Sequence, residues 1–181
     1  MLKALCLAFV LAFGVSYAQA ETLDPANTVY LDTKDGRVVI KLRPDLAPKH
    51  VEQIKTLVKQ GFYNGIVFHR VIDGFMAQTG DPTGTGTGGS TLPNIKAEFT
   101  PQPFNRGTLG MARSQDPNSA NSQFFICFGP AAFLNGQYTV FGEVVSGMEF
   151  VDKIKKGDQA SNGTVRQPDK IVKMQMMQDA N

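Results

Sequence analysis

FHRVIDGFMAQTGD, the stretch from Phe68 to Asp81, carries the clearest structural signal in the sequence. Two short apolar runs flank Asp73-Gly74, and an Asp-Gly pair between such runs is a strong signal for a tight turn between antiparallel strands. We therefore expect strands at Ile66–Val71 and Met76–Thr79, joined by this turn. This part of the chain is predicted to be β-structure.

Similar runs occur on both sides of this stretch. They are short and are bounded by Gly, Pro or Asn, which is typical of strands. The further strands that they predict are Thr28–Asp32, Arg37–Leu42, Ile95–Phe99, Thr108–Ala112, Phe124–Phe128, Val140–Val144 and Ile171–Met176. Many short strands favour an all-β sandwich or barrel, and closure into a barrel would remove their exposed edges.

Two segments carry a helical pattern. The first begins at Pro48 and ends at Gly61, with its apolar residues on one face. The second covers Gly147–Lys156, with Ser146 as N-cap and Gly157 after its end. Pro at the start and Gly after the end are the usual boundary signals of helices. Two helices among so many strands argue against βαβ units.

The first twenty residues have the features of a cleaved secretory signal. Basic Lys3 precedes an apolar run over Ala4–Val15, and small residues at Ala18 and Ala20 form a cleavage site. The run is too short to span a bilayer about 30 Å thick, which takes roughly 20 apolar residues. We expect cleavage after Ala20, which divides the chain into a signal peptide, residues 1–20, and one folded domain, residues 21–181.

The expected domain is close to neutral. The full chain has a formal charge of +2, and the signal peptide removes one lysine. A near-neutral domain without a basic stripe is not expected to bind nucleic acid. No second long apolar stretch is present, so we expect no membrane insertion after cleavage. Cys6 leaves with the signal peptide, so Cys127 has no partner for an internal disulfide.

Two patterns resemble known sites without their usual context. Gly84–Gly89 matches G-x-G-x-x-G, but Pro93 discourages the helix that a dinucleotide site needs, so we expect a flexible surface loop. His50, His69 and Cys127 have unrelated spacing and do not form a convincing zinc site. Structural roles are favoured for both histidines, on a helix and in a strand respectively.

Two further patterns leave alternatives open. A Cys127–His69 nucleophile pair is conceivable, but the strand around Cys127 would bury the thiol and suppress its reactivity. Asn162-Gly163-Thr164 is formally a glycosylation acceptor, but Asn-Gly more often forms a turn.

Three segments, taken together, resemble the cyclophilin family. They are FHRVIDGFMAQTGD at residues 68–81, GTLGMAR at 107–113, and NSQFFI at 121–126 followed by FLNG at 133–136 and VFG at 140–142. Their order and spacing are family-like over nearly the whole domain. The resemblance implies a mainly β fold, a closed eight-stranded antiparallel barrel capped by two α-helices, with the active groove on its outer face. It also implies peptidyl-prolyl cis/trans isomerase activity.

The resemblance assigns roles at matching positions. Arg70, Phe75 and Gln78 match the catalytic positions. The matching substrate-binding positions are Met76, Ala112, Arg113, Gln123, Phe125, Phe133, Leu134 and Tyr138. Three residues depart from common family members, which often have Trp at Phe133, His at Tyr138 and Asn at Arg113. These departures imply weak cyclosporin binding.

Met111-Ala112-Arg113 resembles bacterial members of the family more closely. With the signal peptide, this resemblance implies a periplasmic protein, or one in a secretory lumen or outside the cell if the source is eukaryotic. The partners expected are proline-containing unfolded or partly folded exported proteins, and we expect a monomer.

The reaction itself explains the residue types. Rotation about an X-Pro bond breaks no covalent bond, so no cofactor, metal or nucleophile is expected. The enzyme must favour the twisted amide, and the permanently charged guanidinium of Arg70 suits its localised lone pair. An alternative is a proline-peptide-binding chaperone or adhesion module in which catalysis is incidental. Arg70 favours the enzyme, because binding alone would not need an arginine.

Overall fold

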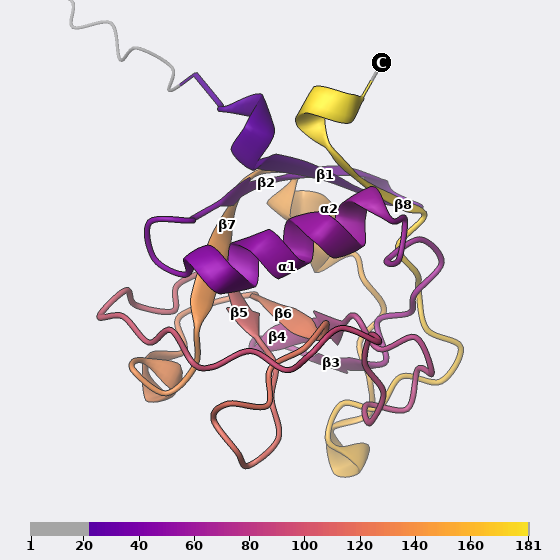
Figure 1. Ribbon diagram of the computed structural model, residues 1–181. Coiled ribbons are helices and arrows are strands. Elements are labelled where there is room, and N and C mark those ends of the chain that lie inside the picture. The colour runs from indigo at the N-terminus through magenta and orange to yellow at the C-terminus, as the bar shows by residue number, and fades with distance from the viewer. Residues whose placement is uncertain (1–21, 181) are drawn as a thin grey trace, which may run out of the picture.

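The computed structural model describes residues 22–180, so the expected signal peptide, residues 1–20, lies outside the described residues. Within residues 22–180 the chain forms one eight-stranded antiparallel sheet and two α-helices (Figure 1). The strands are β1 (Thr28–Thr33), β2 (Gly36–Leu42), β3 (Arg70–Ile72), β4 (Met76–Thr79), β5 (Thr108–Met111), β6 (Phe124–Cys127), β7 (Val140–Ser146) and β8 (Lys173–Met176). The helices are α1 (Pro48–Lys59) and α2 (Met148–Asp152). The mainly β fold predicted from the sequence is confirmed.

The sheet curls until its two end strands approach each other. Hydrogen bonds between the segments that precede these two strands in the chain join the ends. The strand order is β3-β4-β6-β5-β7-β2-β1-β8, which leaves β3 and β8 at the ends. Phe68 N–H donates to the Asp169 carbonyl at 2.8 Å, and Ile171 N–H donates to the Ile66 carbonyl at 2.9 Å. Closure therefore uses single bridges between irregular segments, and the backbone groups there are still paired.

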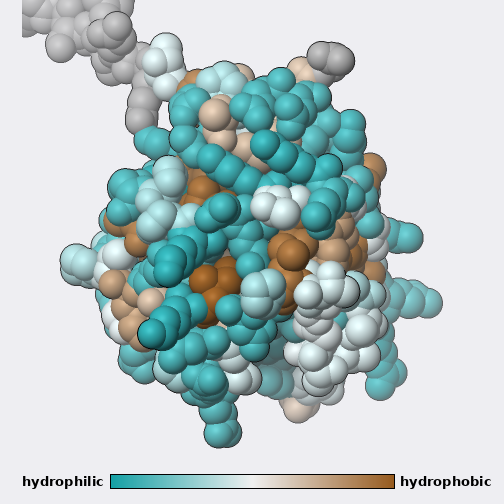
Figure 2. Space-filling view, in the orientation of Figure 1, coloured by the Kyte–Doolittle hydropathy of each residue, from teal (hydrophilic) through white to brown (hydrophobic). Residues whose placement is uncertain are grey.

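The interior of the sheet holds the main hydrophobic core, and α1 covers one mouth of it. Figure 1 shows α1 across the near side and α2 in fainter colour behind it. The inner face of α1 buries Val51, Ile54, Leu57 and Val58, as its apolar pattern predicted. On the face in Figure 2, hydrophobic residues show as separate brown groups among hydrophilic ones, as expected where α1 turns its polar side outward.

A side chain from a distant loop caps the start of α1. Ala47 at the N-cap offers no side-chain acceptor. The Glu98 carboxylate instead accepts the N–H groups of Lys49 at 3.2 Å and His50 at 3.1 Å. A carboxylate at this end also complements the helix dipole. Glu98 therefore ties the 92–107 loop to α1.

The predicted strand at Ile95–Phe99 is wrong. Ile95 makes only an isolated bridge to Ala120, and the segment is otherwise irregular. Two of its N–H groups donate to side chains: Ala97 N–H to Asn118 Oδ1, and Glu98 N–H to Thr139 Oγ1. Because these acceptors satisfy the backbone, no neighbouring strand is required.

Other predicted boundaries shift by a few residues. The strand predicted at Ile66–Val71 is β3, Arg70–Ile72, so His69 lies one residue before the strand. The strand predicted at Ile171–Met176 is limited to β8. The N-cap of α2 is Gly147 with φ of 86°, not Ser146, because β7 continues through Ser146. After Asp152, i→i−3 bonds replace α-helical ones.

Candidate functional site

A second, smaller hydrophobic cluster lies outside the main core. Its buried members are Met76, Phe104, Phe125, Cys127, Ala131, Leu134 and Val140. Strand register brings the members on β4 and β6 together, because partners in an antiparallel ladder point to the same face. Met76 of β4 pairs with Cys127 of β6 and with Ile72 of β3. The cluster forms the floor of a surface site.

A pocket of about 390 Å³ lies over this cluster. It is lined by Arg70, Phe75, Met76, Gln78, Ala112, Arg113, Phe125, Phe133, Leu134, Gln137 and Tyr138. Every predicted site residue except Gln123 lines it, so four separate segments of the sequence meet here. Gln137 was not predicted, since a glutamine in a turn gives no local signal of a site.

The apolar wall of the pocket is held by ring contacts. Phe125 stacks on buried Phe104 with ring centroids 5.7 Å apart, and Tyr138 meets it edge-on at 5.9 Å. Also in the pocket lining, the ring of Phe133 tilts against that of Phe75, with centroids 5.2 Å apart. Such offset and edge-on pairs fix ring orientation and add to area burial. The wall is therefore a preformed apolar surface.

One row of side chains crosses the sheet beneath the pocket. Arg70 pairs with Gln78, Gln78 with Phe125, and Phe125 with Gly110, on β3, β4, β6 and β5 respectively. The row runs from charged through polar to apolar and ends at a glycine. A built Cβ on Gly110 would collide with the rings of Phe125 and Phe104. Glycine therefore makes room for the aromatic wall.

Arg70 is held by three neutral acceptors. Its Nη1 donates to Gln78 Oε1 at 3.1 Å, its Nε to the Asn162 carbonyl at 3.0 Å, and its Nη2 to Asn162 Oδ1 at 3.0 Å. Partial burial lowers the pKa of Arg70 from its ordinary value, but arginine stays protonated in proteins. Its charge therefore sits at the pocket edge without a carboxylate among these three partners.

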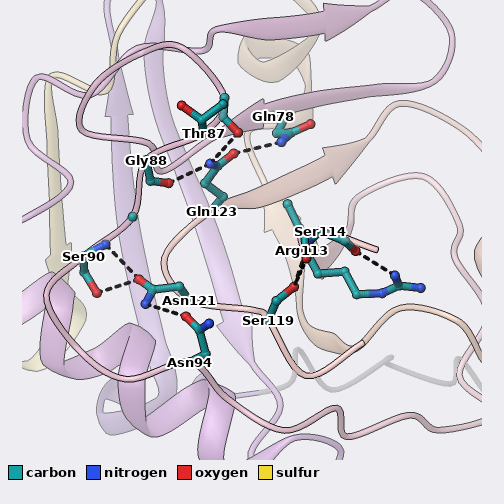
Figure 3. Close-up of a pocket in the computed structure, with 13 residues that line it drawn as sticks. Gln78, Thr87, Gly88, Ser90, Asn94, Arg113, Ser114, Ser119, Asn121 and Gln123 are labelled. Carbon is teal, nitrogen blue, oxygen red and sulfur yellow. Dashed lines mark hydrogen bonds between the residues drawn. The ribbon is translucent and has the colours of Figure 1, made fainter. Parts of the chain in front are cut away.

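Gln123 lies behind Gln78 and not in the apolar pocket. Its Nε2 donates to the carbonyls of Gly86 at 3.0 Å and Gly88 at 2.8 Å, and its Oε1 accepts from Gln78 Nε2 at 3.0 Å (Figure 3). Because both amide hydrogens go to the loop, the oxygen must face Gln78. Gln78 in turn presents its oxygen to Arg70.

The Gly84–Gly89 loop is folded around a buried carboxylate. Asp81 accepts the N–H groups of Thr83, Thr85, Gly86 and Gly88. Burial opposes ionisation, but these bonds and the Thr83 hydroxyl outweigh it and lower the pKa of Asp81 to about 2. The loop is thus ordered by Asp81, and the expectation of a flexible loop is corrected. The N–H groups of Thr85, Gly86 and Gly88 are therefore already occupied and cannot bind a phosphate.

A second, more polar cavity of about 610 Å³ adjoins the first. Figure 3 shows this cavity between the Gly84–Gly89 loop and the 112–121 segment. Gln78, Ala112 and Arg113 line both cavities. Arg113 spans the boundary. Its guanidinium donates to the Gln137, Ser114 and Gln115 carbonyls and lies 4.5 Å from the Tyr138 ring centroid. In this structure Arg113 fixes the rim.

The remaining chemically active candidates lie elsewhere. Cys127 is fully buried, and burial raises the pKa of its thiol to about 12, which removes the thiolate that a nucleophile needs. His50 is buried on α1 and bonds Glu98 through Nδ1 at 2.6 Å. Among residues 22–180, no group of three or more His, Cys, Asp or Glu side chains could hold a metal ion. Nor is any helix of that region long and apolar enough to cross a membrane.

Comparison with known proteins connects this geometry to a family. The family model described as cyclophilin type peptidyl-prolyl cis-trans isomerase/CLD matches residues 28–176. A "Probable peptidyl-prolyl cis-trans isomerase" of Brucella suis is 60% identical over 183 residues, covering 94% of this chain and 93% of its own. "Peptidyl-prolyl cis-trans isomerase-like 1" of Aspergillus fumigatus is 43% identical over 133 residues, covering 71% and 82%.

Solved structures agree with the sequence relatives. The cyclophilin AquaCyp293 from Hirschia baltica has a TM-score of 0.79 at 29% identity, covering 89% of this chain and 77% of its own. A cyclophilin type isomerase of Cryptosporidium parvum, crystallised in the presence of the dipeptide Ala-Pro, has a TM-score of 0.76 at 31% identity, covering 85% and 99%. The chain therefore belongs to the cyclophilin type peptidyl-prolyl cis-trans isomerases. It is an enzyme that catalyses rotation about X-Pro peptide bonds.

Proposed function

We propose that the apolar pocket binds the proline ring of an X-Pro peptide and that Arg70 stabilises the twisted amide. The observation that carries this proposal is the position of a guanidinium, bound to three neutral oxygens, at the edge of a preformed aromatic pocket. Of the five N–H groups of an arginine, these bonds use three, so one on Nη1 and one on Nη2 remain for a substrate.

The chemistry of amide rotation explains why such a site would catalyse. The barrier to cis/trans rotation is about 18–20 kcal/mol because the C–N bond is partly double. At the top of the barrier the lone pair is localised on the proline nitrogen, so a cation aimed there stabilises that state selectively. A hydrogen bond to a charged group contributes about 1.5–3 kcal/mol, or one to two decades of rate. Desolvation in the pocket and positioning of the peptide supply the remainder.

The proposed roles fall into two groups, one that contacts the proline ring and one that contacts the peptide backbone. Phe75, Met76, Phe125, Phe133, Leu134 and Tyr138 would form the pocket and rim around the ring, while Gln78, Ala112, Arg113 and Gln123 would border the peptide backbone. Gln78 has a second role, since its oxygen orients Arg70. This arrangement favours an enzyme over a binding module in which catalysis is incidental.

We propose further that the substrates are unfolded or partly folded exported proteins and that the enzyme acts as a periplasmic monomer. The signal-like pattern at residues 1–20 supports export. The Ala-Pro dipeptide used with the Cryptosporidium relative supports a proline-containing peptide as ligand. N-terminal sequencing of protein from its native compartment should give Glu21. An intact Met1 would contradict export by this route.

Replacement of Arg70 tests the catalytic role. Arg70→Ala should lower kcat/KM on an X-Pro peptide by one to two decades, and Arg70→Lys should restore little, because a point charge cannot reproduce the planar fork. Peptide affinity, measured by NMR titration, should change much less. Exposed Arg166 provides the control, and Arg166→Ala should leave activity unchanged. A folded Arg70→Ala variant with near-full activity would refute the role.

A further inference from the structure

The turn Asp158–Thr164 is hydrogen-bonded to the outer edge of β3, next to Arg70. Val71 N–H donates to the Gly163 carbonyl, and Gly157 N–H donates to the Val71 carbonyl, both at 2.8 Å. Val165 N–H donates to the His69 carbonyl at 3.1 Å. Since β3 is the last strand in the sheet order, this turn covers an edge that would otherwise be free.

Glycine at position 163 allows the turn to approach this closely. Its φ is 78°, and a built Cβ would collide with the Ile72 side chain. Gly163 N–H also donates to the Asp158 carbonyl at 2.8 Å, which closes the turn. The turn is thus fixed both internally and against the strand that carries Arg70.

Asn162 occupies the position in this turn that faces Arg70. Its φ is 52°, in the left-handed region that non-glycine residues seldom adopt and that Asn tolerates best. In that conformation its carbonyl accepts from Arg70 Nε and its Oδ1 accepts from Arg70 Nη2, both at 3.0 Å. One residue therefore contacts two nitrogens of the guanidinium.

We propose that Asn162 is a positioning residue that fixes the guanidinium of Arg70 for catalysis. Two bonds from Asn162 and one from Gln78 determine both the plane and the rotation of the group. The two N–H groups left over then point away from these acceptors. An aspartate at this position would pair with the charge of Arg70. Because Asn162 is neutral, it orients the guanidinium and leaves the charge unpaired. The inference rests on the proposed role of Arg70 in catalysis.

Two variants of Asn162 separate the parts of this proposal. Asn162→Gly keeps the backbone carbonyl and tolerates φ of 52°, so it removes only the Oδ1 bond. We expect kcat to fall about five- to tenfold with KM nearly unchanged, in keeping with an exposed bond to a charged group. Asn162→Asp keeps the acceptor but adds a charge. We expect a loss at least as large, relieved as pH falls and the new carboxyl is protonated.

The matched control is Gln167→Gly. Gln167 is also exposed, has φ of 53°, and lies outside both cavities. Gln167→Gly introduces glycine at the same left-handed backbone conformation but removes no contact with Arg70, so activity should be unchanged. Thermal melting of each variant confirms folding.

A double-mutant cycle gives the decisive test. If Asn162 acts through Arg70, Asn162→Gly should have no further effect in the Arg70→Ala background. Equal losses in both backgrounds would overturn the inference, since they would indicate a general structural role. Full activity of Asn162→Gly alone would overturn it as well. If Arg70→Ala itself is active, the proposed function fails first, so the two failures are distinguishable.

Discussion

Phe133 is the most exposed aromatic residue of the apolar pocket. The residue is 64% exposed, lines the pocket and packs its ring against that of Phe75. The phenylalanine ring has no N–H, so the side chain of Phe133 can contribute contact area but no hydrogen bond. A short, flexible X-Pro peptide can bind mainly through contacts with the deeper apolar wall around Phe125. A large cyclic ligand that covers the rim would lose both the bond and part of the contact.

We therefore predict weak cyclosporin binding, and Phe133→Trp should tighten it about tenfold. Tryptophan adds ring area and a donor at the rim, together worth roughly 1–2 kcal/mol. Turnover of a short X-Pro peptide should change less than about twofold. Titration calorimetry measures the first effect and a coupled isomerase assay the second. Phe99→Trp is a suitable control, because Phe99 is 42% exposed and lies outside both cavities. Tight binding by the unmodified protein would contradict the prediction.

The residues of this site differ in how far the sequence could predict them. Arg70, Gln78 and Phe125 lie within strand patterns, where alternation places them on one face, and the family resemblance identified them. Asn162 lies 92 residues from Arg70 along the chain. Its contact depends on edge bonds between β3 and a turn, which no local pattern indicates. The Asn-Gly pair predicted a turn there, but not its neighbour.

At the level of elements, β5 is shaped by the ring that lies across it. Gly110 pairs with Phe125, and the rings of Phe104 and Phe125 fill the place of its missing side chain. Both rings are buried, so neither has room to retreat. Strand pairing and pocket shape therefore depend on the same glycine.

Gly110→Ala should accordingly damage both stability and activity. Overpacking of this kind costs about 1–3 kcal/mol, and displacement of Phe125 would narrow the proline pocket. We expect a lower Tm and a several-fold lower kcat/KM. Gly129→Ala serves as control, since its built Cβ meets only the Gly74 carbonyl at an ordinary 3.6 Å. An active Gly110→Ala variant with unchanged Tm would show that the rings adjust freely.

Element prediction succeeded where neighbouring strands satisfy the backbone and failed where side chains do. The segment Ile95–Phe99 has strand-like composition, but the side chains of Asn118 and Thr139 accept the N–H groups of Ala97 and Glu98. The Gly84–Gly89 loop has the composition of a flexible loop, and its order comes from one buried carboxylate. In both cases the deciding partner lies outside the segment, so composition could not reveal it.

At the scale of the whole molecule, two buried histidines connect the fold to pH. His50 joins α1 to the Glu98 loop, and burial lowers its pKa although Glu98 acts in the opposite direction. Burial also lowers the pKa of His69, which lies near Asp81 and Arg70. Neither His50 Nε2 nor the two ring nitrogens of His69 have a hydrogen-bond partner among residues 22–180. Protonation would thus place a charge on each buried ring. At His50 the Glu98 carboxylate offsets that charge only in part, and at His69 no hydrogen bond to a ring nitrogen offsets it.

We predict that stability falls as pH drops below about 6.5. The unfolded chain then binds protons at both histidines while the folded state resists them, so the free energy of unfolding rises with pH through this window and falls on acidification. A second loss should follow below about pH 4, because the pKa of Asp81 is held at about 2 in the fold. Urea unfolding at a series of pH values measures both phases. His50→Asn keeps a donor in the place of Nδ1 but cannot titrate, so its slope between pH 7 and pH 5 should be shallower. A wild-type curve that is flat over this interval, or an equally steep His50→Asn curve, would show that His50 does not govern acid stability.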